Sequence, residues 1–445
     1  MLNDEIQFAR EIKAGKLELI CPEMDLLVCP SYEDVALKGM GVIRSNDLGR
    51  LYFRMISPPS GHRHPSLVLS KLAGENPDPT DYVMLRAIDE VGREWRSNWL
   101  IINIGNQIPL PNYSVSHSIG TISHSHERKA LEHSKVRIVV PNAPTVPFDA
   151  ITKTSKSTAE REIGWSSTVD HHVHRVGESE VTFRGEDGGF LSIEANMKGA
   201  FGPTWAGFMC HSLGFAAAET IRPAVVVREF SDREDFELRS GPFLRYASRM
   251  PRPIHFRGLE GARDFWRLVE HFLKYVSEEL SGSKQDQLLE ELEGIRRGSQ
   301  GSFQTACLTL AVGVESICKL LLGGQTTESA CTNIVTELLK YLDKWPGDSG
   351  VKNRAQGMLS GLTAVRASDL MYAWARETGN ATTLVDSWKK LRNPKAHGAT
   401  VDEDEGQVFY YSVVELLHRV IATAIRYEGP ITRTSQRGWG LDSPS

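Results

Sequence analysis

The sequence lacks any long uninterrupted run of apolar residues. Its most apolar segment, LTLAVGVESICKLLLGG at 308–324, contains Glu315 and Lys319. The first residues, MLNDEIQFAREIKAGK, are charged and have no apolar centre of the kind that a secretory signal carries. We therefore expect a buried helix at 308–322, not a membrane span, in a cytoplasmic protein with no membrane partner.

Cysteine pairs and common nucleotide-binding motifs are also missing. The six cysteines are scattered without C-x-x-C spacing, so we expect buried thiols in a reducing compartment instead of a disulfide framework or a zinc site. There is no P-loop, no G-x-G-x-x-G after a strand and no G-x-S-x-G. The net charge of -5 argues against binding nucleic acid through bulk positive charge, although a local basic cleft is compatible with it.

The first half of the chain has the pattern of a β-rich domain. Hydrophobic residues make up 40% and charged residues 24%, an ordinary globular composition. Short β-branched or alternating runs such as GRLYFRMIS, PSLVLSKL, NWLIINIG, KVRIVVPN and AVVVREF fill residues 16 to about 245, with turn signals between them. They predict an antiparallel sandwich or barrel over residues 1–250, interrupted by one helix at PTWAGFMCHSLGFAAAE.

The second half has helical periodicity from about residue 258. In ARDFWRLVEHFLKYVSEEL the apolar residues recur on one helical face, and FQTACLTLAVGVESICKLLL is apolar nearly all round. Further helical segments lie at 328–345, 357–379, 382–391 and 404–427. We predict an α+β chain of two domains, with an all-α helical bundle at 251–430 and a flexible tail at 431–445.

The segment WKKLRNPKAHG, residues 388–398, carries the candidate chemistry. Arginine and histidine at such spacing also occur at Arg128 and His133 and at Arg249 and His255, so the spacing alone says little. Around Arg392 and His397, however, Asn393 follows the arginine and the pair lies in the helical half. We expect the helix to end near Arg392, with Asn393 and Pro394 starting a tight turn that brings Arg392 and His397 to a common point.

Two interpretations of this segment remain open. A histidine can move a proton to or from a ribose oxygen, an arginine can hold the scissile phosphate, and Asn393 can orient either group. One histidine cannot easily serve as both acid and base, so a two-fold dimer that joins two such sites is expected. Alternatively, His397 only caps a helix end and Arg392 only forms a surface ion pair.

LRNPKAHG within a helical bundle resembles the motif of the HEPN superfamily of ribonucleases. The W-x-x-L-R-N-x-x-x-H-G context and the helix LTLAVGVESICKLLL are most similar to the Apea-like branch, in which a β-rich domain precedes the HEPN domain. The resemblance covers residues 258–427, and more weakly FMCHSLGFAAAE. It implies catalytic roles for Arg392, Asn393 and His397. It also implies metal-independent RNA cleavage without a cofactor, a homodimer or higher homo-oligomer, and often a part in antiviral defence.

Several residues near this motif allow both a functional and a structural interpretation. The resemblance implies that Glu315 lines the cleft, whereas its spacing to Lys319 predicts a simple i,i+4 ion pair. A basic rim of Lys389, Lys390 and Lys395 either holds RNA backbone or solvates a helix end.

Three His-x-His pairs in the β-rich half are candidate metal ligands. They are His62 and His64, His124 and His126, and His172 and His174. Residues i and i+2 of a strand share a face, so each pair offers two imidazoles to a metal, yet no third ligand follows at a recognisable spacing. Solvent-facing histidines explain the pattern more simply, and no metal is expected. If one pair does bind metal, His172 and His174 beside Asp170 are the best choice.

The leading hypothesis is thus a HEPN-type endoribonuclease that leaves 2′,3′-cyclic phosphate ends. Its β-rich domain would sense a trigger, such as a phage product, or restrain cleavage in an abortive-infection response. The alternatives are a non-catalytic HEPN module that dimerises or binds nucleotides, and a β-sandwich ligand binder with an oligomerising helical domain.

Overall fold

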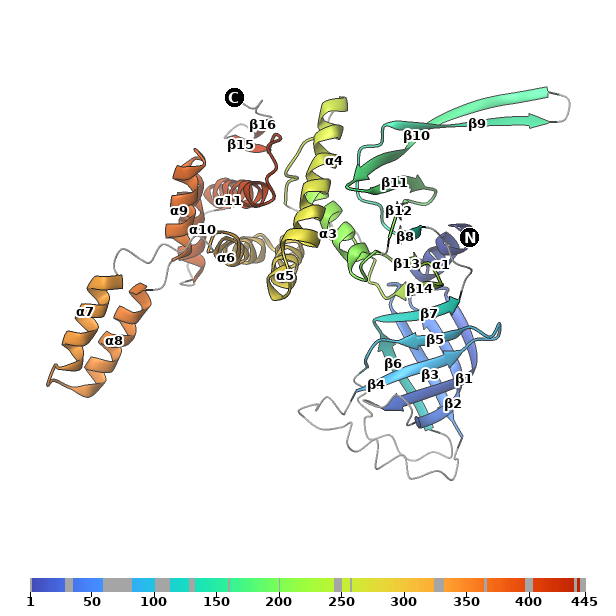
Figure 1. Cartoon of the computed structure of the whole chain (residues 1–445), viewed down its shortest axis with the longest axis horizontal. Coiled ribbons are helices and arrows are strands. Elements are labelled where there is room, and N and C mark those ends of the chain that lie inside the picture. The colour runs from blue at the N-terminus through green and yellow to red at the C-terminus, as the bar shows by residue number, and fades with distance from the viewer. Residues whose placement is uncertain are drawn as a thin grey trace. The chain divides into compact units, whose positions relative to one another are not determined.

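The computed structural model describes thirteen stretches of the chain. These are residues 2–28, 35–58, 82–100, 113–127, 133–158, 161–199, 201–243, 250–256, 258–323, 332–363, 366–396, 403–435 and 438–440. They form a β-rich N-terminal part followed by a helical C-terminal part (Figure 1), so the predicted α+β class is confirmed. The predicted strands at PSLVLSKL and at residues 101–105 lie outside the described residues.

The chain divides into two compact units. The first holds residues 1–210 and 221–246, and the second holds 211–220 and 247–445. The division lies close to the predicted boundary at residue 250, except that 211–220 are grouped with the helices. These ten residues include the end of helix α3 (Trp205–Ala217), where Phe215 stacks on Phe272 at a centroid distance of 4.8 Å. That aromatic contact explains why the segment belongs with the helical unit.

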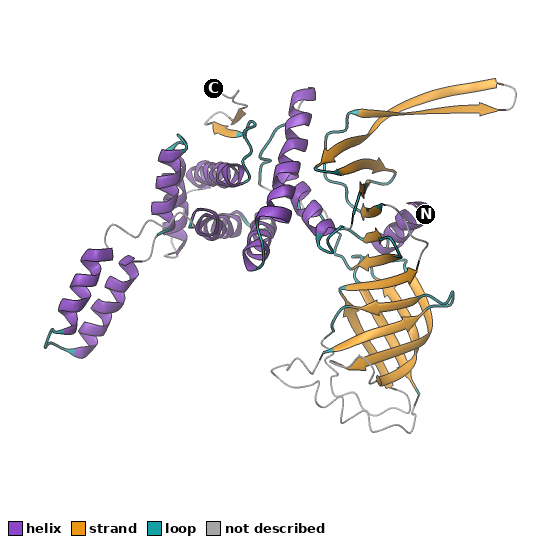
Figure 2. Cartoon of the chain, in the orientation of Figure 1, coloured by secondary structure: helices purple, strands orange, loops and turns teal. Residues whose placement is uncertain are grey.

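The described strands of the first unit form one antiparallel sheet (Figure 2). Its fourteen strands are ordered β6-β3-β2-β1-β4-β5-β7-β14-β13-β8-β12-β11-β10-β9. Their bounds are β1 Glu18–Val28, β2 Val35–Ser45, β3 Leu51–Ser57, β4 Val83–Ile88, β5 Glu94–Ser97, β6 Tyr113–Ile119, β7 Thr121–Glu127, β8 Ser134–Val140, β9 Ala150–Thr158, β10 Arg161–Val176, β11 Ser179–Glu186, β12 Phe190–Met197, β13 Val225–Glu229 and β14 Arg233–Arg239.

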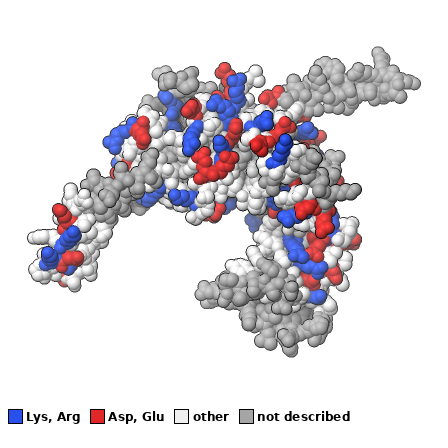
Figure 3. All heavy atoms as spheres, in the orientation of Figure 1, with Lys and Arg blue, Asp and Glu red and all other residues white. Residues whose placement is uncertain are grey.

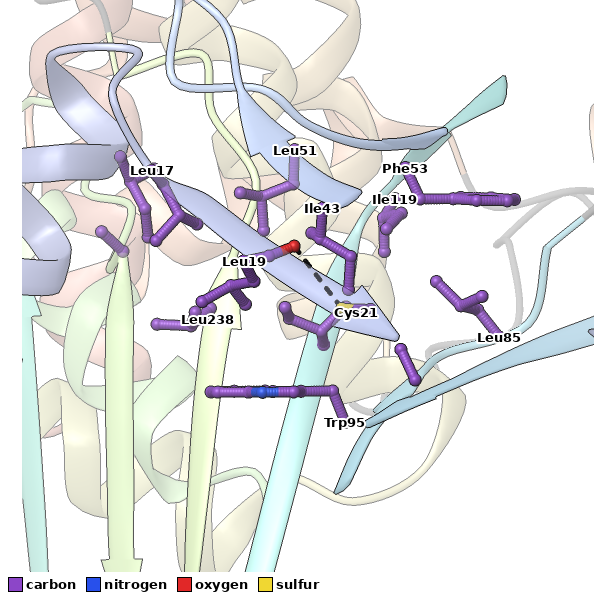
Figure 4. Close-up of a cluster of buried hydrophobic side chains, with 14 of the residues drawn as sticks. Leu17, Leu19, Cys21, Ile43, Leu51, Phe53, Leu85, Trp95, Ile119 and Leu238 are labelled. Carbon is purple, nitrogen blue, oxygen red and sulfur yellow. Dashed lines mark hydrogen bonds between the residues drawn. The ribbon is translucent and has the colours of Figure 1, made fainter. Parts of the chain in front are cut away.

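Alternation of apolar and polar residues explains why the strands at the β1–β7 end have one buried face. Along LYFRMIS in β3, Leu51, Phe53 and Met55 are buried while Arg54 and Ile56 are exposed. Side chains of successive residues point to opposite faces of a sheet, so this period of two buries one face only. The buried faces meet in the core of Figure 4, where Trp95 packs among leucine and isoleucine side chains. Burial of this apolar surface is the main stabilising contribution.

The first residues form a helix that the sequence analysis did not predict. In α1 (Leu2–Lys13), Ile6, Ala9 and Ile12 are buried and join the core cluster of the sheet. Their spacing of three places them on one helical face, but the segment is short and highly charged. The packing partner that stabilises it is far away in sequence, so local pattern alone gave a weak signal.

The second unit is a helical bundle, as predicted. Its described elements after α3 are α4 Gly258–Lys274 with a π-helical turn at Tyr275–Glu279, α5 Ser283–Ser299, α6 Phe303–Leu322, α7 Thr332–Asp343, α8 Ser349–Thr363, α9 Ala367–Glu377, α10 Thr382–Ala396 and α11 Glu403–Ala424. Two short strands follow, β15 (Arg433–Ser435) and β16 (Gly438–Gly440). The predicted flexible tail therefore contains a small hairpin, and Thr432 just before it donates its amide hydrogen to the Pro253 carbonyl at 2.8 Å.

Helix α6 packs at the centre of the bundle and contacts α5, α9, α10 and α11. Among the described helices it is the one long and apolar enough to cross a membrane, and half of that stretch is buried inside the protein. Gly313 allows α5 to approach closely, because a Cβ atom there would lie 2.6 Å from the Ile295 side chain. Cys307 and Cys318 of this helix are buried free thiols, like Cys21 and Cys210 in the described part of the chain.

Two predicted helix boundaries were wrong. The segment 357–379 contains parts of two helices, α8 and α9. More important, α10 does not end near Arg392 but continues through Asn393 and Pro394 to Ala396. Proline lacks the N–H that would bond the carbonyl four residues earlier, yet only the last turn of α10 is affected. The packing of α10 on α6 and α11 outweighs that local preference.

Two histidines, the buried His418 and the half-buried His211, should make the helical unit sensitive to acid. Burial lowers the pKa of His418 to about 3 and that of His211 to about 4, with nearby Arg419 and Arg296 acting in the same direction. In the unfolded chain each histidine would take up a proton near pH 6.5. Their contribution to stability is therefore complete above that pH and is lost as the pH falls toward the folded-state values.

We predict that lowering the pH from 7 to 5 costs about 2 kcal/mol of unfolding free energy through His418 alone. Urea denaturation of the wild-type chain and of His418→Leu at both pH values measures it. The leucine variant should show the smaller pH dependence. Equal dependence in the two proteins would refute the assignment to His418.

Candidate functional site

Helix α10 is anchored on α6 by a tryptophan. Trp388 is 4% exposed, and its indole Nε1 donates a hydrogen bond to the Ala311 carbonyl of α6 at 2.9 Å. Leu391, one turn further, is fully buried. Because residues 388 and 392 are one helical turn apart, this anchor also positions Arg392 along α6. The sequence suggested no specific role for Trp388, since an indole contact to a backbone carbonyl leaves no pattern in the chain.

Arg392 forms an ion pair with Glu315 across the two helices. Its Nε lies 2.7 Å from Oε2 of Glu315, while Oε1 of the same carboxylate accepts from Lys319 Nζ at 2.8 Å. The predicted i,i+4 pair is therefore confirmed, and Glu315 also contacts the motif arginine. That Glu315 lines an RNA cleft stays a prediction. The Arg392 guanidinium further lies 5.7 Å from the centre of the Trp388 ring. Two neighbours, Glu315 and Trp388, thus restrict a side chain that remains 40% exposed.

The two cations keep the Glu315 carboxylate ionised. Burial alone would raise the pKa of Glu315, but the hydrogen bonds from Lys319 and Arg392 outweigh it and hold that pKa below its ordinary value. The Glu315 carboxylate accepts a hydrogen bond from Nε of Arg392 and so fixes that edge of the guanidinium. The Arg392 side chain is 40% exposed, and its guanidinium has further N–H donors that can bind an oxyanion.

The remaining motif residues are only partly described. Asn393 and Lys395 lie on the helical backbone of α10, but their side chains are outside the described set, and His397 falls outside the described residues altogether. The predicted tight turn between Arg392 and His397 is wrong, because residues 392–396 are helical. His397 follows the helix directly, one residue beyond Ala396, which shares a helical face with Arg392.

The lysines of the expected basic rim contact different aromatic rings. Lys389 lies 4.5 Å from the centre of the Tyr372 ring, and Lys390 lies 5.1 Å from that of Phe409. Consecutive helical residues are separated by roughly 100°, so Lys390 lies on the side of α10 away from Arg392. Of the two, Lys389 is the one closer to the Arg392 face.

An exposed apolar stripe on α6, which no sequence pattern predicted, leads to the ion pair. Leu308 and Val312 are 47% and 53% exposed. Together with Glu315 and Lys319 they are spaced by four, three and four residues, so all four lie on one face of α6. In a helix that is apolar nearly all round, the sequence does not show which apolar residues are left uncovered.

The histidine pairs of the β-rich unit have other partners. His124 Nδ1 contacts the Glu94 carbonyl at 3.1 Å, and His172 Nδ1 contacts Asp149 at 2.8 Å. Each stacks on the second histidine of its pair, His126 or His174. Within the described stretches no three His, Cys, Asp or Glu side chains are placed to hold a metal ion. The pair His62 and His64 lies outside the described residues.

A shallow cavity of about 180 Å³ lies in the first unit. Aromatic rings of Phe8, Trp95 and Phe236 form part of its wall, and Phe8 meets Phe236 edge-on at 5.4 Å. Arg137 and Glu5 also line the cavity; both are buried, and their charged groups lie 2.6 Å apart. Burial raises the pKa of Glu5 more than the arginine lowers it. This mixture of rings and buried charge resembles small-molecule sites in general.

Comparison with protein-family models, with curated proteins and with solved structures gave no match. The interpretation of the chain therefore depends on its own residues and their geometry.

We predict that Trp388→Phe loosens α10 specifically. Removing the indole hydrogen bond while keeping an aromatic ring should cost about 1 kcal/mol. Trp374→Phe is the matched control, because Trp374 Nε1 donates a comparable bond to Thr423 at 3.3 Å. Hydrogen–deuterium exchange should become faster in α10 for the first variant and in α9 for the second. Unchanged exchange in α10 would show that Trp388 is not an anchor.

Proposed function

We propose that the protein is a HEPN-type endoribonuclease that cleaves RNA without a metal ion. The observation that supports this most is the contact between Arg392 and Glu315, which lie 77 residues apart in sequence. An arginine required only as a surface charge needs no buried anchor or orienting carboxylate. The resemblance of LRNPKAHG to the HEPN motif supplies the reaction type.

In the proposed reaction the ribose 2′-oxygen attacks the neighbouring phosphorus and the 5′-oxygen leaves. Arg392 donates hydrogen bonds to the phosphate oxygens, whose negative charge increases in the transition state. His397 transfers the proton, as general base or general acid, and Asn393 orients the ribose or the imidazole. Glu315 is a positioning residue, because it contacts Arg392 and not the RNA. The products carry 2′,3′-cyclic phosphate and 5′-hydroxyl ends.

A homodimer would supply the second histidine that the reaction needs. The exposed residues Leu308 and Val312 lie on the same face of α6 as Glu315. Pairing of two such faces around a two-fold axis would bury these apolar side chains and bring two Arg392 residues to one groove. We infer that α6 forms this interface. Lys389 and Lys395 then contact the RNA backbone on either side.

The β-rich unit is proposed to regulate the nuclease in a cytoplasmic antiphage response. We infer that its β1–β7 part is barrel-like, and that it recognises a phage-derived trigger or masks the RNA groove. Because residues 211–220 are grouped with the helices, removing residues 1–250 would also remove Phe215 from the bundle. A protease site inserted between Phe243 and Met250 of the full chain tests the restraint more cleanly. Equal RNA cleavage before and after proteolysis would rule it out.

Cleavage of RNA by the full chain in the presence of EDTA is the main prediction. We expect Arg392→Ala and His397→Ala each to lower the rate by about two to three orders of magnitude. Glu315→Gln should lower the cleavage rate less, since Trp388 still anchors α10 and with it Arg392. The matched control is Arg267→Ala, which removes a half-exposed arginine paired with Asp264 on α4.

The outcome separates the three hypotheses. Loss of cleavage in EDTA would contradict the metal-independent mechanism. A wild-type chain that cleaves no RNA but forms dimers would favour the non-catalytic module. The cavity lined by Phe8, Trp95 and Phe236 favours the third candidate, a ligand-binding β-rich domain, if a small molecule binds there and cleavage is absent.

A further inference from the structure

Helices α7 and α8 form an antiparallel hairpin with its own internal contacts. Lys352 Nζ and Gln356 Nε2 of α8 donate to the carbonyl and to the carboxylate of Asp343, each at 2.6 Å. Asp348 accepts a hydrogen bond from the Val351 amide at 2.9 Å and so caps the start of α8. Val335 is the one fully buried hydrophobic residue among the described side chains of the hairpin. Leu339 and Leu342 are half-buried, and the remaining large apolar side chains of α7 are exposed.

An apolar stripe follows one face of α7 and remains exposed. Ile334, Leu338 and Tyr341 are 61%, 45% and 76% exposed, and Trp345 just beyond the helix end is 39% exposed. Their spacing of four, three and four residues is that of the a and d positions of a coiled coil. Leaving this stripe exposed is unfavourable in a monomer, because a partner that covered it would remove apolar surface from water.

The exposed apolar residues of α8 extend the same face. Val351 and Met358 are 57% and 72% exposed and lie two turns apart. On α7 each exposed residue stands one position before a more buried one, Val335, Leu339 or Leu342. On α8, Val351 and Met358 likewise stand one position before the half-buried Lys352 and Leu359. One position is a rotation of roughly 100°, in the same sense on both helices. Since the two helices run in opposite directions, both sets point to one side of the hairpin. The hairpin thus presents an apolar face two helices wide, which we call the hairpin face.

We propose that the hairpin face binds the hairpin face of a second copy of this chain, with the two α7 helices antiparallel. The spacing of the stripe is symmetric about its centre, so this pairing sets Leu338 against Tyr341 of the second copy and Ile334 against Trp345 of the second copy. Every member of the stripe then meets an apolar partner. An unrelated partner would not require such internal symmetry.

Charge complementarity supports the same arrangement. Glu337 and Lys344 flank the stripe on the edge away from α8, at g positions of the heptad pattern. In an antiparallel coiled coil g positions face each other, so Glu337 of each copy meets Lys344 of the other. On the α8 edge, Arg354 of one copy then faces Arg354 of the other, and repulsion between these like charges weakens the association. We therefore expect a reversible contact instead of a permanent one.

The charge of the hairpin argues against RNA or a membrane as the occupant. Its residues 332–363 carry four basic and three acidic side chains, and Figure 3 shows both signs on its surface. Binding to nucleic acid or to anionic lipid would call for a clear excess of basic residues. A second copy of the chain has the nearly neutral, self-complementary surface that this face fits.

The experiment measures self-association of the full chain by sedimentation velocity across a range of concentrations. Leu338→Asp should raise the dissociation constant of this contact by at least about tenfold, as expected for a charge buried in the centre of an interface. Asn353→Asp, an exposed position on the opposite side of α8, is the matched control and should leave it unchanged.

Charge exchange tests the register directly. Glu337→Lys and Lys344→Glu should each weaken association, because like charges then meet, and the double variant should restore it. Leu308→Asp serves as a background that removes the proposed α6 dimer, so the two contacts can be told apart. Association equal in Leu338→Asp and Asn353→Asp, or a double variant weaker than both single exchanges, would overturn the proposal whatever the fate of the nuclease assignment.

Discussion

The position of Arg392 relative to α6 is the constraint on which the candidate site depends. It is set by two contacts one helical turn apart, the indole of Trp388 on the Ala311 carbonyl and the guanidinium of Arg392 on Glu315. The first is buried and geometrically strict. The contact between Arg392 and Glu315 is half-exposed, so it contributes little to stability and acts mainly by orienting the guanidinium. Together they hold a cation at the surface with little freedom, as transition-state stabilisation requires.

The residues around the Arg392–Glu315 pair both restrain it and leave the adjoining face of α6 exposed. Lys319 donates to the same Glu315 carboxylate, and together with Arg392 it holds the pKa of Glu315 below its ordinary value. The apolar residues Leu308 and Val312 on the same α6 face provide a reason for two copies to meet there. The hairpin of α7 and α8 provides a separate apolar face with a different charge pattern. If both proposed contacts form, the chain assembles beyond a dimer, and several copies of the proposed RNA site lie in one particle.

Sequence patterns predicted much of the fold because the hydrophobic periods are clear. The strands KVRIVVPN and AVVVREF and the helices α4, α6 and α11 lie where their apolar spacing placed them. The pattern failed where tertiary packing decides. Helix α1 depends on a distant sheet, and α10 passes through Pro394 because its buried face on α6 outweighs the missing hydrogen bond. Residues 364–366, between α8 and α9, include no glycine or proline that would predict the end of a helix.

The candidate site shows the same division. Arg392 and Glu315 were both suggested by the sequence, but their contact was not, since only the packing of α10 on α6 brings them together. The exposure of Leu308, Val312 and the stripe on α7 depends on which helices cover which faces, and composition does not reveal it. Conversely, the expected turn before His397 relied on the local preference of proline, and the helix overrode it.

Exchanging the two charges of the central pair tests the account most directly. The double variant Glu315→Arg, Arg392→Glu retains an ion pair between α6 and α10 but moves the guanidinium from α10 to α6. We predict that it unfolds in urea within about 1 kcal/mol of the wild type and has lost RNA cleavage. Cleavage by the double variant at the wild-type rate, or its absence in the wild type, would contradict the account.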